Sequence, residues 1–405
     1  MANNANRMNA TNNQRPKKAE TVSGKTFLIS NRQSGAIIAS SLIGVGVLTL
    51  PRDMTQTAGE SAWIATIGGG LIAMFGMAII VILSNRYPGK SIIEYAADAL
   101  GPANHPMIGR LLSFPIFLAL FLFWGSSTAI VARTFGEVVI TTVLTKTPLE
   151  VIISTMLVTG FVLVMYNEEV LARVNEILLP IIVIPVLVIA LSSLQSARLD
   201  NLLPVFNGNW GGLFKSILTT SGSYLGFEIM AVLYAKAEMS DKRMSGSMVG
   251  LAIPSFIYVL IVVSGIAVFG VEEIQLLAWP TLELVKTTAV PGLILERLES
   301  AFLGVWVAAV FTSVGNMYFT TAVIAKQALK LRSHRWIAVC LLPFFYWLSL
   351  RPQNVQELFQ YQNWSGKFGI FIAFVVPVLL LIISLLRKQR GNSGENRKEA
   401  KPSYE

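Results

Sequence analysis

Charged residues and metal-binding side chains are both scarce in this sequence. Charged residues make up 14% of the 405 positions, whereas a soluble domain carries roughly 25%, so there is too little charge to cover a water-facing surface. One cysteine and two histidines exclude a disulfide framework and argue against a metal site with several protein ligands. No histidine–acid cluster and no nucleophile–base pairing stands out. We therefore expect neither an enzyme nor a bound metal or cofactor.

Long hydrophobic runs take the place of the missing charge. Hydrophobic residues make up 53% of the chain, and its mean hydropathy is +0.60. A membrane span needs about 20 mainly apolar residues, and it must be helical because lipid offers the backbone no hydrogen-bond partner. We predict an all-α integral membrane protein with about ten transmembrane helices, of which the fourth and ninth are short: Gln33–Leu50, Ala62–Leu83, Leu111–Val131, Val151–Met165, Leu171–Leu194, Leu213–Ala235, Met248–Phe269, Ala301–Ile324, Trp336–Leu350 and Phe368–Leu386.

The basic residues favour one orientation of these spans. The net charge is +9, but the lysines and arginines lie between apolar runs, which argues against nucleic acid and for a lipid bilayer as the partner. With a cytosolic amino terminus, the inner segments hold about three times as many basic residues as the outer ones, as the positive-inside rule requires. We therefore predict two cytosolic termini, with a disordered head (residues 1–30), a transmembrane domain (31–387) and a cytosolic tail (388–405).

The predicted spans repeat with a period of five. Glycines interrupt the first span at Gly44-Val45-Gly46 and the sixth span at 222–226, and a short helical segment follows both the second span (91–100) and the seventh (272–286). Because five is odd, the second repeat (213–386) enters from the opposite face to the first (33–194), which is typical of an inverted repeat with paired broken helices. The alternative is that these glycines only permit close helix packing.

Two such breaks predict a pocket for a zwitterion. A broken helix exposes N–H groups that suit a carboxylate and carbonyl groups that suit an ammonium. We expect the N–H groups of residues 46–48 to bind the carboxylate of an amino acid, and carbonyls near residues 42, 43 and 223 to bind its ammonium. A side chain at Gly44 or Gly46 should abolish the ligand response without preventing folding. The predicted pocket residues are Gly44, Val45, Gly46, Val47, Trp124, Ser223, Leu225, Phe227 and Thr312.

Two charged residues lie close to the predicted breaks. Glu228 follows the break in the sixth span, and an acid at membrane depth is costly enough to suggest a function. It could relay a proton or hold an outer gate with an arginine; the alternative is a structural ion pair or a helix cap. Arg52 follows Pro51 at the outer end of the first span, where it could gate the pocket or simply anchor the helix at the interface.

Four short stretches give the chain a family resemblance. Residues 43–52 (IGVGVLTLPR) resemble the first helix of the amino acid–polyamine–organocation transporter superfamily. Together with 59–64 (GESAWI), 87–95 (YPGKSIIEY) and 224–228 (YLGFE), they more narrowly resemble the B-subunit family of endospore nutrient germinant receptors, the spore germination permeases. The resemblance extends over most of the chain, although the family usually has aspartate where Glu60 stands.

The resemblance implies ten helices in two inverted repeats and a small nutrient ligand, usually an amino acid. It also implies an A-type membrane subunit and a C-type lipoprotein as partners, in the inner membrane of a dormant spore. We therefore expect a receptor subunit that binds a nutrient and triggers germination. The alternatives are a secondary active amino-acid transporter and an ion or water channel, because a sensor and a transporter need the same pocket.

The resemblance also raises the question of sodium. In sodium-coupled relatives of this fold, two hydroxyls on helix eight complete a cation site with carbonyls of helix one. Here Thr312 and Ser313 could do so with the carbonyls of Ser40 and Ile43. Adjacent hydroxyls on a membrane helix more often bond their own backbone, so we expect ligand binding not to be tightly coupled to sodium.

Overall fold

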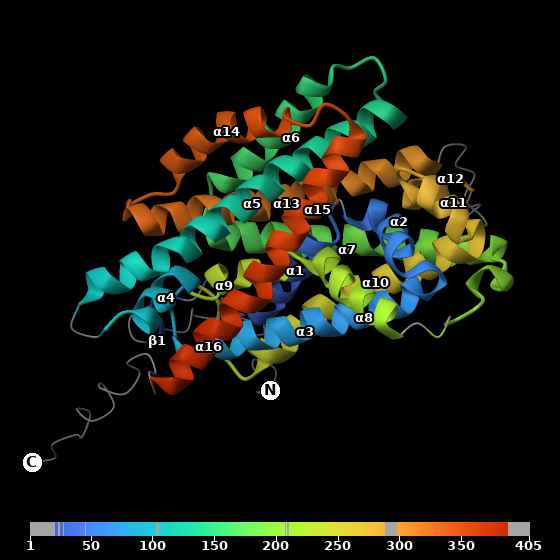
Figure 1. The fold of residues 1–405 in the computed structure, drawn as a ribbon. Coiled ribbons are helices and arrows are strands. Elements are labelled where there is room, and N and C mark those ends of the chain that lie inside the picture. Colours follow the sequence, from blue (N-terminus) through green and yellow to red (C-terminus); the bar gives the residue numbers. More distant parts are fainter. Residues whose placement is uncertain are drawn as a thin grey trace, which may run out of the picture.

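The fold of this chain is built almost entirely of helices. The computed structural model describes residues 21–22, 25–26, 28–44, 46–102, 105–206, 208, 210–287 and 298–387. Its α-helices are α1 (Asn31–Leu42), α2 (Gly46–Ala58), α3 (Ala62–Arg86), α4 (Ile92–Leu100), α5 (Pro106–Thr142), α6 (Leu149–Val164), α7 (Glu168–Ser193), α8 (Trp210–Thr220), α9 (Met230–Leu233), α10 (Lys242–Phe269), α11 (Val271–Leu276), α12 (Pro280–Thr287), α13 (Leu298–Leu329), α14 (Arg335–Ser349), α15 (Val355–Ile370) and α16 (Val376–Leu386) (Figure 1).

Short elements connect these helices. They are the 3₁₀ turns η1 (Gly59–Ser61), η2 (Leu194–Ser196), η3 (Leu199–Leu202), η4 (Ser221–Tyr224) and η5 (Phe227–Ile229), and the π-helical turn η6 (Phe371–Val375) that joins α15 to α16. A two-residue antiparallel pair, β1 (Thr21–Val22) with β2 (Lys25–Thr26), precedes them.

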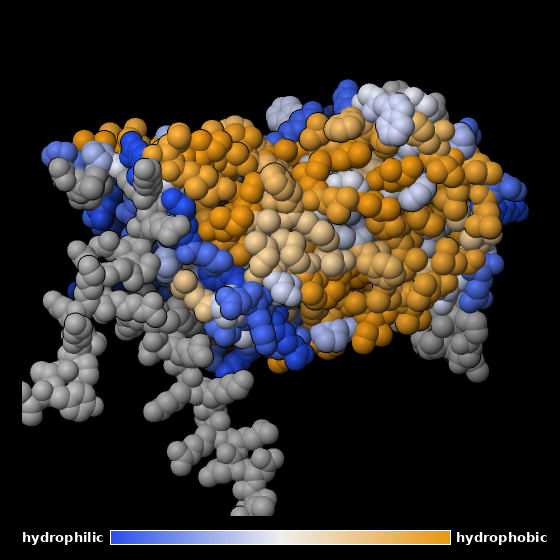
Figure 2. Space-filling view, turned by 90° about the horizontal axis from the view of Figure 1, so that it is seen from below, coloured by the Kyte–Doolittle hydropathy of each residue, from blue (hydrophilic) through white to orange (hydrophobic). Residues whose placement is uncertain are grey.

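The helices have the length and surface of an integral membrane protein. Among the described residues, six helical stretches are apolar and long enough to cross a bilayer, and the bent stretch from α8 to α9 is a seventh candidate. The two spans predicted to be short form the shorter apolar helices α6 and α14. Figure 2 shows a face covered mainly by hydrophobic residues. On α3, for example, Leu71 and Phe75 are each more than half exposed. The all-α membrane fold is confirmed, while the count of ten spans stays a prediction.

The two inverted repeats are visible in the order of the elements. The first span is broken between α1 and α2, and the sixth is broken between η4 and η5, where the helix direction changes by 54°. The short helix α4 follows the second span, and α11 with α12 follows the seventh, as the repeat predicts.

Helix α1 lies at the centre of the bundle, where it packs on α7, α10 and α13. Small residues allow its close approach to α10, since a Cβ atom on Gly35 would lie only 2.7 Å from the carbonyl oxygen of Gly246. Just before α1, Ile29 forms a β-bridge with Ala237, which follows the sixth span. The start of α1 is thus tied to the segment that follows the sixth span. The predicted head and tail stay predictions, since residues 1–20 and 388–405 lie outside the described residues.

Candidate functional site

The two helix breaks lie directly against each other. Gly226 in the second break has a φ of +128°, a conformation that only glycine adopts without strain. A Cβ atom there would lie 3.1 Å from the carbonyl oxygen of Ser41, in the last turn of α1. The predicted pairing of the breaks is therefore a feature of the fold, and it depends on the missing side chain of Gly226.

Neutral side chains from other helices satisfy the carbonyl groups of the first break. Trp306 Nε1 on α13 donates to the Gly44 carbonyl at 3.1 Å, and Ser313 Oγ donates to the Ser40 carbonyl at 3.0 Å. The hydroxyl of Tyr258 on α10 donates to the Leu42 carbonyl. The carbonyls of Ser40 and Leu42 are among those expected to attract a cation. Each keeps a second lone pair, but its first partner is uncharged.

The N–H end of the first break is more open than the carbonyl end. Val45, one of the predicted pocket residues, lies outside the described residues. Among the described residues, a Cβ atom on Gly46 would meet only the Tyr258 hydroxyl, at 3.6 Å, whereas one on Gly44 would lie 2.3 Å from Ser313 Oγ. Gly46 therefore borders free space at the start of α2, where helix N–H groups favour an anion. At Gly44, the close packing of the chain against α13 leaves no room for a side chain.

The outer side of α2 is held by the two short helices of the second repeat. Thr281 Oγ1 on α12 donates to the carbonyl of Val47 at 2.7 Å, and Gln275 on α11 donates to the carbonyl of Thr55 at 3.0 Å. These bonds fix the position of α2 relative to α11 and α12.

A buried carboxylate closes the second break from within. Glu228 Oε2 accepts the backbone N–H of Gly226 at 2.7 Å, and Glu228 Oε1 accepts the indole N–H of Trp124 on α5 at 3.2 Å. Glu228 is only 2% exposed and Trp124 is fully buried. The carboxylate thus joins α5 to the sixth span, and no ion pair between it and another described side chain is present.

The remaining predicted wall residues face different neighbours. Leu225 lies against Phe123 and Gly369, between α5 and α15, while the ring of Phe227 makes an edge contact with Phe374 at 5.8 Å. Ser223 is half-buried in the second break. Leu225 therefore packs toward the last span, and the ring of Phe227 lies between the last span and Gly76 of α3.

The two hydroxyls considered for sodium behave differently. Thr312 Oγ1 donates to the carbonyl of Ala309 in its own helix at 2.9 Å, whereas Ser313 reaches Ser40 on α1. Thr312 thus adopts the local hydrogen bond typical of such residues. Only one of the two hydroxyls is directed at the first break.

Arg52 takes part in an aromatic contact rather than in an ion pair with Glu228. Its guanidinium lies 4.1 Å from the centre of the Phe359 ring on α15, and Trp279 contacts the same ring at 5.7 Å. The Arg52 Nε atom is buried without a hydrogen-bond partner. Arg52 thus connects α2 to α15 at the end predicted to face outward. A cation–π contact of this kind contributes about 0.5–2 kcal/mol.

An amide pair that sequence reasoning missed connects three helices behind the first break. Asn175 on α7 and Asn316 on α13 exchange hydrogen bonds of 2.8 and 2.9 Å, and Asn316 also donates to Ser41 Oγ at 2.9 Å. All three side chains are buried. Asparagine is expensive at membrane depth unless paired, so two asparagines inside predicted spans were a signal that could have located this network.

Comparison with known proteins finds relatives that match most of the chain. The model of the family described as spore germination protein matches residues 28–358. Spore germination protein YndE of Bacillus subtilis (strain 168) is 31% identical over 365 residues, which cover 90% of this chain and 98% of that protein. Spore germination protein A2 of the same organism is 27% identical over 358 residues, covering 88% and 95%.

Solved structures that resemble this fold include transporters. The Eremococcus coleocola manganese transporter has a TM-score of 0.63 at 17% identity, covering 94% of this chain and 85% of that chain. MhsT in complex with L-phenylalanine has a TM-score of 0.58 at 13% identity, covering 88% and 97%. Mhp1, a nucleobase-cation-symport-1 family transporter with bromovinylhydantoin bound, has a TM-score of 0.59 at 13% identity, covering 92% and 96%. At these identities the likeness establishes the shared fold alone.

Proposed function

We propose a receptor function from one premise: this chain belongs to the spore germination protein family. It is an integral membrane protein of that family, and we propose that it is the nutrient-binding membrane subunit of a germinant receptor in the spore inner membrane. Its proposed partners are an A-type membrane subunit and a C-type lipoprotein. Its proposed ligand is a small zwitterion, with an α-amino acid as the first candidate.

The observation that carries this proposal is the contact between the two breaks beside an open helix N-terminus. The free space at Gly46 adjoins the N–H groups that begin α2, which suit a carboxylate. In the second break, the buried carboxylate of Glu228 is the group that we propose attracts the ammonium. A zwitterion carries a carboxylate and an ammonium a few bonds apart. In this proposal, the carboxylate binds the N–H groups of α2 and the ammonium is attracted to Glu228.

The same contacts support signalling as the output of binding. The carbonyls of the first break are held by donors from α10 and α13, so a ligand that moves α1 relative to α2 changes those contacts too. A ligand that binds one arrangement better than another shifts the populations of the two. A preference of about a hundredfold corresponds to about 2.7 kcal/mol, enough to switch a closely balanced receptor.

Two matched variants test the pocket. We expect Gly46→Val to abolish binding of the germinant amino acid, because its methyl groups occupy the space at the start of α2. Gly304→Val is the control, since a Cβ atom there meets nothing within 4 Å. Binding is measured by isothermal titration on the purified proteins, and germination by the loss of optical density of spores that carry each variant. Normal binding by Gly46→Val would remove this pocket from the proposal.

A secondary active amino-acid transporter is the second candidate, favoured by the fold shared with MhsT and Mhp1. Uptake of radiolabelled amino acids into proteoliposomes separates the two functions, together with germination of spores that lack the gene. Sodium-driven accumulation with normal germination of the deletion strain would replace the receptor by the transporter. The reverse result would support the receptor.

A further inference from the structure

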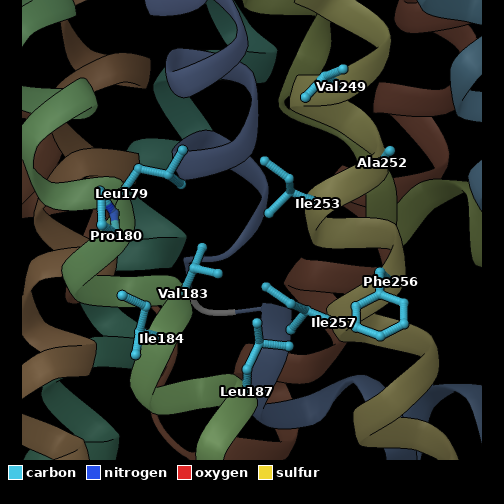
Figure 3. A pocket seen from close by; sticks show the side chains of 10 residues that line it. All are labelled: Leu179, Pro180, Val183, Ile184, Leu187, Val249, Ala252, Ile253, Phe256 and Ile257. Atoms are coloured by element: carbon cyan, nitrogen blue, oxygen red, sulfur yellow. The ribbon is translucent and has the colours of Figure 1, made fainter.

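An apolar groove lies between α7 and α10. It encloses about 550 Å³ and is lined by Leu179, Pro180, Val183, Ile184, Leu187, Val249, Ala252, Ile253, Phe256 and Ile257. Figure 3 shows the residues of α7 along one wall and those of α10 along the other. None of these ten side chains carries a polar atom. The groove therefore offers a ligand only van der Waals contacts.

The groove has a closed floor and an open rim. Ile257 at the floor is 1% exposed, while Ile184 and Phe256 at the rim are 59% and 62% exposed. Both walls contain internal prolines, Pro180 and Pro185 in α7 and Pro254 in α10. A proline inside a helix removes a backbone hydrogen bond and bends the helix. Two bent helices do not pack closely along their whole length.

We propose that this groove binds an acyl chain of a bilayer phospholipid. It opens sideways from two membrane-spanning helices, so the hydrocarbon of the bilayer is what reaches it. A partner transmembrane helix is a poorer match, because helix pairs in membranes approach each other over small residues, and Ala252 is the only small residue among the lining side chains. A flexible unbranched chain can follow the bulky leucine, isoleucine and valine walls.

Charges at one end of the groove match a phospholipid headgroup. Arg32 at the start of α1 pairs with Glu176 of α7 at 3.1 Å, and its side chain is still 84% exposed. Asn31 donates to Ser240, just before α10, at 2.6 Å, so the start of α10 lies near this point, as does Glu176 of α7. Lys242 is exposed and lies about 10 Å along α10 from Val249 at a rise of about 1.5 Å per residue.

This end of the groove carries charges of both signs. Exposed Asp241 stands beside Lys242, and half-buried Glu176 stands beside Arg32. A headgroup with a phosphate and an ammonium, as in phosphatidylethanolamine, complements such a pair of charges. We place the phosphate at Arg32 and Lys242, with the chain running along the groove toward the centre of the bilayer.

The location gives the bound chain a structural effect on the first break. Helix α1 packs on both α7 and α10, so a chain in the groove supports the two walls against which α1 lies. Filling or emptying the groove therefore changes the packing around α1.

Photo-crosslinking in lipid vesicles tests the proposal. The purified protein is reconstituted in phosphatidylethanolamine that carries a diazirine midway along one acyl chain, irradiated, digested and mapped by mass spectrometry. We expect adducts to concentrate on 179–187 and 249–257. Ala252→Phe should lower them about tenfold, the equivalent of about 1.4 kcal/mol in binding free energy, because its ring fills the groove. Val158→Phe, on the exposed face of α6, is the matched control and should leave the adducts unchanged.

Three results would overturn the assignment. Adducts spread evenly over all exposed helices, or unchanged in Ala252→Phe, would mean that the groove holds only bulk lipid. Equal labelling by phosphatidylglycerol with the same diazirine chain would remove the headgroup assignment. A photoreactive residue in place of Phe256 that captures a protein rather than lipid in the intact spore membrane would assign the groove to a partner helix instead.

Discussion

The two helix breaks of this chain are stabilised in opposite ways. The first depends on donors from distant helices, since Tyr258, Trp306 and Ser313 each donate to one of its carbonyls. The second has an acceptor within its own segment, because the carboxylate of Glu228 accepts the N–H of Gly226 two residues earlier, although Trp124 on α5 also donates to that carboxylate. A break held from outside transmits movement to its neighbours, whereas a break held from within keeps its shape. On this comparison, we expect the movement caused by a bound ligand to pass through the first break, while the second keeps its shape.

The largest effect is expected from a side chain at the second break. Gly226→Val should cost about 3 kcal/mol or more of folding stability, because it strains a left-handed backbone conformation and brings its Cβ to 3.1 Å from the Ser41 carbonyl. The measurements are yield after purification and thermal unfolding in detergent. Gly46→Ala is the matched control, expected to unfold like the parent protein. A Gly226→Val protein as stable as the parent would show that the second break is not rigid.

Removal of the internal carboxylate should come next. Glu228→Ala leaves the Gly226 N–H and the Trp124 indole without their acceptor, at a cost of about 1–3 kcal/mol for each buried group left unsatisfied. Glu228→Gln keeps one acceptor oxygen and should lose less stability. Thermal unfolding gives the stability, and titration with the amino acid gives the affinity. If Glu228→Gln binds the ligand as tightly as the parent, the charge plays no part in recognising the ammonium.

The donors to the first break should affect the response more than the stability. We expect Tyr258→Phe and Trp306→Phe each to lower stability by about 1–3 kcal/mol, because each leaves a buried carbonyl without its donor, while shifting the germinant dose–response severalfold. Tyr318→Phe is the control, because its hydroxyl donates to Ala338 on α14, away from both breaks. Equal dose–response curves for all three variants would contradict the role given to the first break.

The asparagine pair should show a smaller, measurable coupling. Buried polar pairs in membrane proteins contribute about 0.6 kcal/mol on average, so Asn175→Ala, Asn316→Ala and the double variant should give a coupling energy of that size in thermal unfolding. Strict additivity would mean that the pair does not connect α7 with α13.

The smallest effect is expected from sodium. Replacing sodium by choline should leave the affinity for the amino acid within about twofold, or about 0.4 kcal/mol, because the first break is already bound by neutral donors and Thr312 bonds its own helix. Ligand titration in the two buffers measures it. A large loss of affinity in choline would restore Thr312 and Ser313 as a cation site.

Several features of this protein follow from the sequence alone, because they depend on local properties. Length and hydropathy determine a membrane-spanning helix wherever they occur, since no other backbone conformation is satisfied in lipid. The glycines at 44–46 and 222–226 likewise mark positions where a helix can break. The all-α membrane fold, the two breaks and the short helices after the second and seventh spans were predictable for this reason.

The partner that each residue at the breaks contacts was decided only by the tertiary structure. Ser313 and Thr312 are neighbours with the same functional group, but only Ser313 faces α1, and helix rotation relative to a remote partner is not encoded in the local pattern. Trp306 and Gly44 are separated by 262 positions, so only the folded chain brings the indole to that carbonyl. Gly44 and Gly46 look equivalent in sequence, yet one packs against α13 and the other borders free space. Packing between distant segments made that difference, because it decides which backbone groups are already satisfied and which remain free for a ligand.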